Sequence, residues 1–347
     1  MNMYVLKKNC KTSLLLALAA VLVLVGTRTV YASSLPAKPS MSLGNIKSEC
    51  ITQHPSGTMV VRSENGAKIT HPDGSTFDVA DKTDCQKVAM EKSKEPLATT
   101  QCPPLHWEYL NAQTWFPPAV VGSFTANYTV PPTPDIVGEQ SLFYWIGLDS
   151  DYGVIQPVLA FSDGGWKFAS FIVANNNIHM SSYIDVKPND VIQAAIKKVP
   201  GENSQYQITA SSSGQSSNLN VDIQGHAMPW AMNVLESWFL QSCNELSEGP
   251  MLFSNIEMKD VAGQVLSPQW TPFTTLVNKN LCKSTMTVNN NGIAVTKPAY
   301  IGLEAGPIWD NSDARNKCPS TCGRACLQWS GQWRTTEPGK QSVCGCN

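Results

Sequence analysis

The chain has 347 residues, of which 42% are hydrophobic and 15% are charged, and its formal net charge at pH 7 is -2. A balance this close to neutrality lacks the basic face that nucleic acid requires, so nucleic acid is not an expected partner. The length exceeds one ordinary core and predicts two or three domains.

The N-terminus has the pattern of a cleaved signal peptide over residues 1–32. Three lysines within residues 7–11 precede an apolar run over 14–25, and small residues at 30–32 offer a signal peptidase site. The 12 residues of the apolar run are too few to span a bilayer, and no later stretch is long enough. We therefore expect a secreted protein without a stable membrane anchor. A retained N-terminal anchor is the alternative.

Cysteine usage agrees with export. The ten cysteines that follow the signal peptide are an even number, as a disulfide framework requires: Cys50, Cys85, Cys102, Cys243, Cys282, Cys318, Cys322, Cys326, Cys344 and Cys346. A zinc site is the alternative for the cluster within 318–346. Its four-residue steps differ from the usual C-x-x-C spacing, and no histidine follows His226. We predict no metal and no cofactor.

Residues 33–101 form a polar, turn-rich first part of the mature chain. Turn signals at 64–66 and 72–74 separate short runs of alternating polarity, which predicts a small β-meander. So few apolar residues cannot hold a core alone, and a disulfide between Cys50 and Cys85 would staple the region. It is interpreted either as a pro-region or as an accessory domain.

Residues 102–298 are dominated by β-branched and aromatic runs that glycine, proline, asparagine and serine interrupt. Strands this regular, with scarcely any helical periodicity, predict an all-β fold with an antiparallel β-sandwich. The expected strands cover residues 123–130, 142–148, 166–173, 178–186, 190–197, 206–211, 218–223 and 251–258.

Two segments of this part each place one polar side chain where an apolar one is expected. Residues 145–149 read W-I-G-L-D and lead to I-Q-P-V at 155–158, and M-N-V-L-E-S-W follows at 232–238. Gln156 and Glu236 therefore stand among apolar and aromatic neighbours at the alternation of a strand. A polar residue at such a position indicates a catalytic or binding site.

These elements, in this order and at this separation, resemble the glutamic peptidases of the eqolisin type. The resemblance implies a concanavalin-like sandwich whose catalytic pair is Gln156 and Glu236. It places Trp145, Asp149 and Trp238 in the substrate groove. Glu236 would take a proton from water as it attacks the scissile carbonyl and return it to the departing amine, while the Gln156 amide donates to the oxyanion. Polypeptides are then the substrates, and they are hydrolysed in acid.

The chain departs from that family in two places. The run at 166–171 carries no acidic residue, and Pro157, which supplies no amide donor, follows Gln156 directly. The alternative is a non-catalytic, glycan-binding sandwich in which Gln156 and Glu236 are polar residues of edge strands. Conventional nucleophiles are not indicated, because the sequence has no G-x-S-x-G elbow and no H-E-x-x-H motif.

Residues 299–347 carry the most specific motifs of the chain. A-G-P-I-W-D-N-S-D-A occupies 305–314, W-S-G-Q-W-R-T-T occupies 329–336, and S-V-C-G-C occupies 342–346. They resemble one repeat of the cyanobacterial mannan-binding lectins, which implies a three-stranded sheet with one helix and high-mannose glycans as partners. Indole rings can stack on the C–H faces of sugars, and polar side chains can form hydrogen bonds with sugar hydroxyls. The candidate glycan-binding residues are Trp309, Asn311, Trp333, Arg334 and Thr335.

The lectin-like module also predicts its own helix and disulfides. Asn311 or Ser312 can cap a helix that runs to about residue 325. Its three cysteines stand at four-residue steps on one face, toward a strand that ends in two more, so two bridges would clamp helix to strand. The fifth cysteine must pair outside the motif, with Cys282 or Cys243 nearest in sequence. Both tryptophans could alternatively be core residues of a small module.

Overall fold

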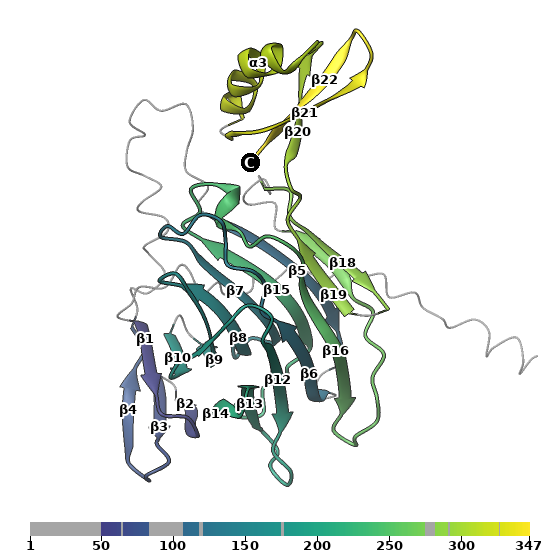
Figure 1. The fold of residues 1–347 in the computed structure, drawn as a ribbon. Helices are drawn as coiled ribbons and strands as arrows, with labels where there is room; N and C mark the ends of the chain where they lie inside the picture. Colours follow the sequence, from purple (N-terminus) through teal and green to yellow (C-terminus); the bar gives the residue numbers. More distant parts are fainter. Residues whose placement is uncertain are drawn as a thin grey trace, which may run out of the picture. The chain divides into compact units, whose positions relative to one another are not determined.

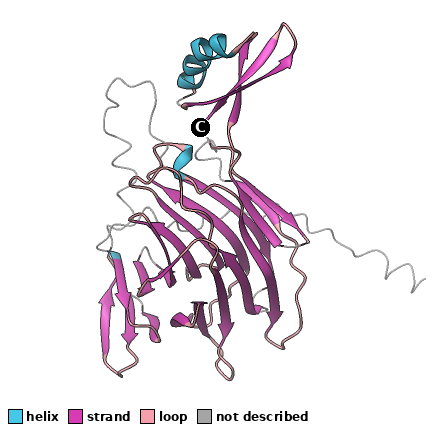
Figure 2. Cartoon of the chain, in the orientation of Figure 1, coloured by secondary structure: helices cyan, strands magenta, loops and turns pink. Residues whose placement is uncertain are grey.

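The computed structural model describes residues 50–63, 65–82, 107–117, 121–174, 177–274, 282–290, 292–325 and 327–347 (Figure 1). Strands dominate these ranges, and their longest helix is α3 (Asn311–Arg324), as Figure 2 shows. The prediction of an all-β fold is confirmed. None of the helices in these ranges is long and apolar enough to cross a membrane. The expected signal peptide lies outside the described residues.

The first sheet, sheet A, has nine strands and carries both polar residues that the sequence singles out. Its hydrogen-bonded order, with β11 (Ile184–Val186) pairing β9 off this path, is β1 (Ile51–His54), β10 (Asn177–Ser181), β9 (Gly165–Ala174), β8 (Val154–Ser162), β7 (Ser141–Asp149), β15 (Trp230–Trp238), β5 (Trp107–Trp115) and β17 (Thr271–Thr274). Gln156 lies on β8 and Glu236 on β15, so both are in the interior of the sheet, and the edge-strand interpretation is wrong.

The second sheet, sheet B, has ten strands. Their order is β18 (Thr285–Asn289), β19 (Gly292–Thr296), β16 (Met251–Asp260), β6 (Val121–Thr129), β12 (Val191–Lys198), β13 (Gln205–Ser212), β14 (Gln215–Asp222), β2 (Thr58–Ser63), β3 (Gly66–Thr70) and β4 (Thr76–Ala80). Strands β12, β13 and β14 alternate between buried and more exposed residues, because one face packs on the core and the other meets water.

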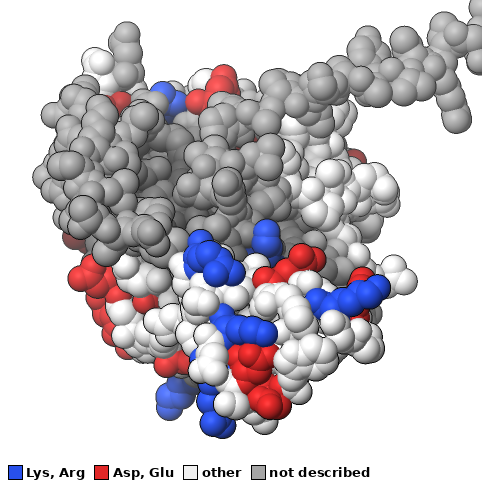
Figure 3. Space-filling model, turned by 90° about the horizontal axis from the view of Figure 1, so that it is seen from above, with Lys and Arg blue, Asp and Glu red and all other residues white. Residues whose placement is uncertain are grey.

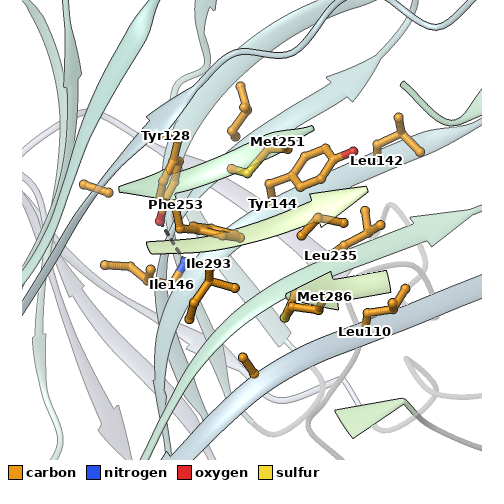
Figure 4. Packing of buried hydrophobic residues seen from close by; sticks show 14 of the residues in the cluster. Leu110, Tyr128, Leu142, Tyr144, Ile146, Leu235, Met251, Phe253, Met286 and Ile293 are labelled. Atoms are coloured by element: carbon orange, nitrogen blue, oxygen red, sulfur yellow. Dashed lines mark hydrogen bonds between the residues drawn. The ribbon is translucent and has the colours of Figure 1, made fainter. Parts of the chain in front are cut away.

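A continuous apolar core fills the space between the two sheets, and Tyr128 of β6 crosses it (Figure 4). The Ile146 N–H of β7 donates to the Tyr128 hydroxyl at 2.7 Å, and that hydroxyl donates to the Pro157 carbonyl of β8 at 3.0 Å. The tyrosine hydroxyl therefore bridges the Ile146 N–H and the Pro157 carbonyl, two backbone groups of neighbouring strands. This contact lies directly beside Gln156. Burial raises the pKa of Tyr128 well above its ordinary value.

The N-terminal strands extend both sheets of the sandwich. β2, β3 and β4 form the meander that the two turns predict, and β2 also runs parallel to β14. β1 runs parallel to β10 at the edge of sheet A. The assignment of residues 33–101 as a pro-region or an accessory domain stays a prediction. Their removal would leave the outer edges of β10 and β14 without these partners, which favours an accessory part that remains.

Two buried histidines lie where β1 meets β10. Nε2 of His54 lies 3.1 Å from Nδ1 of His179, and the two rings stack with centroids 5.4 Å apart. Burial, together with the neighbouring imidazole of His71, lowers the pKa of His54 to about 4. Burial and His54 itself lower the pKa of His179 to about 4. Both rings are therefore neutral at neutral pH.

The C-terminal module is a three-stranded sheet with one helix, as the resemblance implies. Strand β22 (Gln341–Cys346) lies between β20 (Ile301–Gly306) and β21 (Trp329–Glu337), and α3 contacts all three. The expected cap is wrong, because the Asp310 carboxylate caps α3 by accepting from the N–H groups of Ser312 and Asp313 at 2.8 and 2.9 Å. Ser312 is inside the helix, and Asn311 is its first residue.

Two disulfides clamp α3 to β22, as predicted. They join Cys318 to Cys344 and Cys322 to Cys346, which excludes these four cysteines from the alternative zinc site. The predicted pairing of the fifth cysteine with Cys282 or Cys243 is wrong, because these two pair with each other. Cys243 and Cys282 are 39 residues apart in the sequence, and only the folded sandwich brings them together. Cys326 and Cys102 are outside the described residues, as is Cys85, the predicted partner of the disulfide-bonded Cys50.

Candidate active face and glycan module

Gln156 and Glu236 lie on the face of sheet A that points away from sheet B. An apolar cluster made only of sheet A residues covers this face, whereas the core between the sheets contains residues of both. Alternation places Gln156 between Val154 and Val158 of that cluster, and Glu236 next to Val234. We call this surface of sheet A, with these two polar residues in it, the Gln/Glu face.

Strand β7 separates the two polar residues, and Trp145 lies between them. Glu236 pairs with Phe143 of β7, and Phe143 pairs with Ala160, four residues along β8 from Gln156. With strands about 4.8 Å apart and a rise of about 3.3 Å per residue, their Cα atoms are roughly 16 Å apart. Such a separation is too long for a direct hydrogen bond between the two side chains. Trp145 pairs with Val234 and Val158, midway along the diagonal.

The Trp145 side chain is fully buried and leans along its own strand over Gly147. A Cβ atom at Gly147 would lie 2.7 Å from Cζ3 of Trp145, so only glycine leaves room for the indole there. Gly147 faces the position of Gln156 on β8, since the pairs on either side of it follow one register. The W-I-G-L-D motif therefore places an aromatic wall beside the amide of Gln156.

The Gln156 amide is fully buried, and among the described residues neither its nitrogen nor its oxygen has a hydrogen-bond partner. An unsatisfied buried polar atom costs about 1–3 kcal/mol. The neighbours Phe171 and Trp145 are aromatic, and the Trp145 Nε1 also has no hydrogen-bond partner in the part of the chain that the structure describes. A cost of this kind is typical of a group held for a ligand or a transition state.

Glu236 is equally buried, and a tryptophan holds its carboxylate. Trp238 Nε1 donates to Glu236 Oε1 at 2.6 Å, between two residues of β15 that share one face. On the other side β5 pairs Tyr109 with Glu236. The Asn111 amide donates to the Tyr109 hydroxyl at 3.4 Å. Tyr109 and Asn111 were missed from the sequence, and the alternation of aromatic and amide residues in 107–113 was the available signal.

The remaining predicted groove residues lie on the same face. Asp149 is buried at the end of β7 and pairs with Trp230. On β9, where the family resemblance implies an acidic residue, Lys167 pairs instead with Asp163, Nζ to Oδ2 at 3.0 Å, and lies over the Tyr183 ring. Sheet A thus brings together Gln156, Glu236, Trp145, Asp149 and Trp238 without a second acidic residue on β9.

The glycan-binding candidates lie around the start of α3. Trp309 is 69% exposed, so the alternative that it is a core residue is wrong. Trp333 of β21 is partly buried, and its Nε1 donates to Asn311 Oδ1 at 2.8 Å. Arg334 and Thr335 follow on β21 and are exposed. The module therefore presents one exposed indole, Trp309, and one indole that is hydrogen-bonded to the helix, Trp333.

An acidic and a basic side chain form hydrogen bonds at the N-terminal end of α3. Asp313 Oδ2 accepts from Lys317 Nζ at 2.9 Å and from the Trp309 N–H at 3.2 Å. The hydrogen bond from Lys317 is the main cause that lowers the pKa of Asp313. Over the described surface in Figure 3, basic and acidic side chains are interspersed, and neither sign forms a continuous patch.

Comparisons with known proteins find one family match and several structural similarities. Residues 311–346 match the profile of a family described as mannan-binding protein. Scytalido-glutamic peptidase, solved with a peptide-based transition-state analogue, is similar at 13% identity and a TM-score of 0.43, over 56% of this chain and 100% of that chain. SCP-B, an Eqolisin peptidase in complex with the tripeptide Ala-Ile-His, has the same identity and coverage and a TM-score of 0.42. The search of curated proteins finds no match.

Proposed function

We propose that the sandwich is a secreted acid endopeptidase of glutamic type and that the C-terminal module binds high-mannose glycans. The observation that carries the peptidase proposal is the amide of Gln156, which is buried on the same face as the carboxyl of Glu236 and has no hydrogen-bond partner among the described residues. Burying two polar groups on one apolar face lowers the free energy of unfolding, and such a cost is expected mainly at functional sites.

The reaction needs only these two side chains and water. A substrate carbonyl lies over Trp145, between the two polar groups. Glu236 removes a proton from water, the hydroxyl adds to the carbonyl carbon, and the Gln156 N–H groups donate to the resulting oxyanion. Glu236 then gives the proton to the peptide nitrogen, the C–N bond breaks, and a carboxylic acid and an amine leave.

Access to the Gln/Glu face limits this activity. Gln156, Glu236 and Trp145 each have no exposed surface in this structure. A peptide therefore reaches them only after the face opens. We expect a latent enzyme whose rate increases after acid treatment or limited proteolysis.

The test is cleavage of a denatured, unglycosylated protein in acid by the full chain, before and after limited proteolysis. Metal chelators and traps for serine or cysteine nucleophiles should have no effect. Glu236→Gln should lower kcat by about a hundredfold or more, because an amide cannot take the proton. Glu257→Gln, at a half-exposed glutamate of β16, is the matched control and should cleave at the parent rate. Equal rates for the parent and Glu236→Gln would overturn the assignment.

A second candidate is a glycan-binding protein with an inactive sandwich. The closed Gln/Glu face and the match of residues 311–346 to the mannan-binding family favour it. Binding of mannan by the full chain, with no cleavage of any denatured protein under any of these conditions, would decide for this candidate.

A further inference from the structure

A groove of about 540 Å³ opens at the β18 end of sheet B, among residues for which the proposed function has no role. It lies between strand β16, the tip of the β18–β19 hairpin and the segment that leads into β17. Its volume is within the range of pockets that hold small ligands. It shares no residue with the Gln/Glu face or with the C-terminal module.

A β-bulge in β16 shapes one wall of the groove. The pairing of β16 with β6 shifts register between Ser254 and Glu257, and Asn255 within the bulge has a φ of 49°. That left-handed conformation is uncommon outside glycine, although asparagine tolerates it. Bulges of this kind redirect a side chain out of the regular ladder. The exposed Asn255 side chain therefore lines the groove rather than the ladder face.

Trp270 forms the aromatic wall. Its ring stacks on Phe124 with centroids 5.8 Å apart and an interplanar angle of 29°. Phe124 is fully buried in the core, so one face of the indole is fixed against a rigid neighbour. Trp270 is only partly buried and lines the groove, which leaves the opposite face for a ligand. A fixed, half-covered indole suits stacking against the C–H face of a sugar ring.

The polar groups of the groove are neutral. Ser254, Asn255 and Asn290 supply a hydroxyl and amides, which both donate and accept hydrogen bonds. Among the described residues that line the groove, none carries a charge. Nothing there would offset the charge of a phosphate or a carboxylate, whereas a ligand with many hydroxyls finds both donors and acceptors. We propose that this groove binds a neutral oligosaccharide, with one ring on Trp270 and hydroxyls on Ser254 and Asn255.

The experiment is hydrogen–deuterium exchange on the full chain, with and without mannohexaose. Protection is expected in peptides that cover residues 252–256 and 268–270. Affinity is then measured by calorimetry on a Trp333→Ala background, so that the C-terminal module does not dominate. Asn255→Gly removes the amide and keeps the left-handed backbone accessible. The matched control is Asn189→Gly, at an exposed asparagine with a φ of 74° outside the groove.

Asn255→Gly should weaken binding by about fivefold or more, the usual effect of a lost hydrogen bond, and Asn189→Gly should not. Protection confined to residues 299–347 would overturn the proposal. So would equal effects of the two asparagine variants, or tighter binding of an acidic oligogalacturonate than of mannohexaose. The proposal holds or fails whether or not the sandwich cleaves peptides.

Discussion

Trp238 donates its indole N–H to the carboxylate of Glu236 at 2.6 Å, and both residues lie on the buried face of β15. A hydrogen bond to the ionised form favours that form, and it also fixes the carboxylate against its strand. Trp238 is therefore a positioning residue for the proposed general base.

Trp238→Phe keeps an aromatic ring and removes the donor. The acid limb of the kcat/KM profile should move to higher pH, because the carboxylate loses a hydrogen bond that favours its ionised form. The profile of Trp115→Phe, at an indole of β5 that is 44% exposed, is the control and should match the parent. An unchanged acid limb in Trp238→Phe would show that this contact is only structural.

Gln156→Met should separate stability from activity. Methionine fills a similar volume and removes the unpaired buried amide, so the free energy of unfolding should rise by about 1–3 kcal/mol. Loss of the oxyanion donor should lower kcat by about a hundredfold or more. Urea unfolding and acid proteolysis measure the two effects. A destabilised variant would mean that the amide has a partner in the folded protein.

Tyr128→Phe should destabilise the sandwich through the contact beside Gln156. The Ile146 N–H and the Pro157 carbonyl would both lose their partner in a fully buried place. The expected loss is about 2–4 kcal/mol in the free energy of unfolding. Tyr183→Phe, at a partly buried ring over Lys167, is the control and should cost less. Equal losses would contradict the bridging role of Tyr128.

The His54–His179 pair predicts a loss of stability in acid. Both imidazoles have a pKa lowered from 6.5 to about 4 in the folded chain, mainly by burial. Between these values the unfolded chain binds more protons, so the free energy of unfolding should fall as pH decreases from about 6.5 to about 4 and level off below. Urea midpoints across this range measure the slope. His179→Gln should flatten it, and an unchanged slope would contradict the assignment.

Reduction should unfold the C-terminal module first. Its helix is held to β22 by Cys318–Cys344 and Cys322–Cys346, and so small a module buries too little apolar surface to stand without them. Ligand-induced hydrogen-exchange protection of residues 299–347 by mannan should disappear with reduction and with Trp333→Ala. Cleavage of an unglycosylated peptide should survive truncation after about residue 298. Failure of the oxidised chain to bind mannan would leave the module as a disulfide-bonded cap.

The sequence alone singles out Gln156 and Glu236 because alternation is local. A period of two places Gln156 with Val154 and Val158, and it needs no knowledge of any other strand. The same holds for the cysteine steps of α3, where helical spacing predicts the face that meets β22. It fails for the helix cap, since Asp310, Asn311 and Ser312 are all good capping residues and only backbone geometry selects Asp310.

Tertiary structure decides what depends on pairing between distant segments. The pairs of β7 with β8 and β15 set the offset of Gln156 from Glu236 and place Trp145 between them. Tyr128 reaches Pro157 from the opposite sheet. Strand register and sheet order arise from the burial of whole faces against one another. The free energy of this burial depends on several segments at once. Composition and spacing therefore indicate which side chains are candidates, and only the folded sheets determine which of them come into contact.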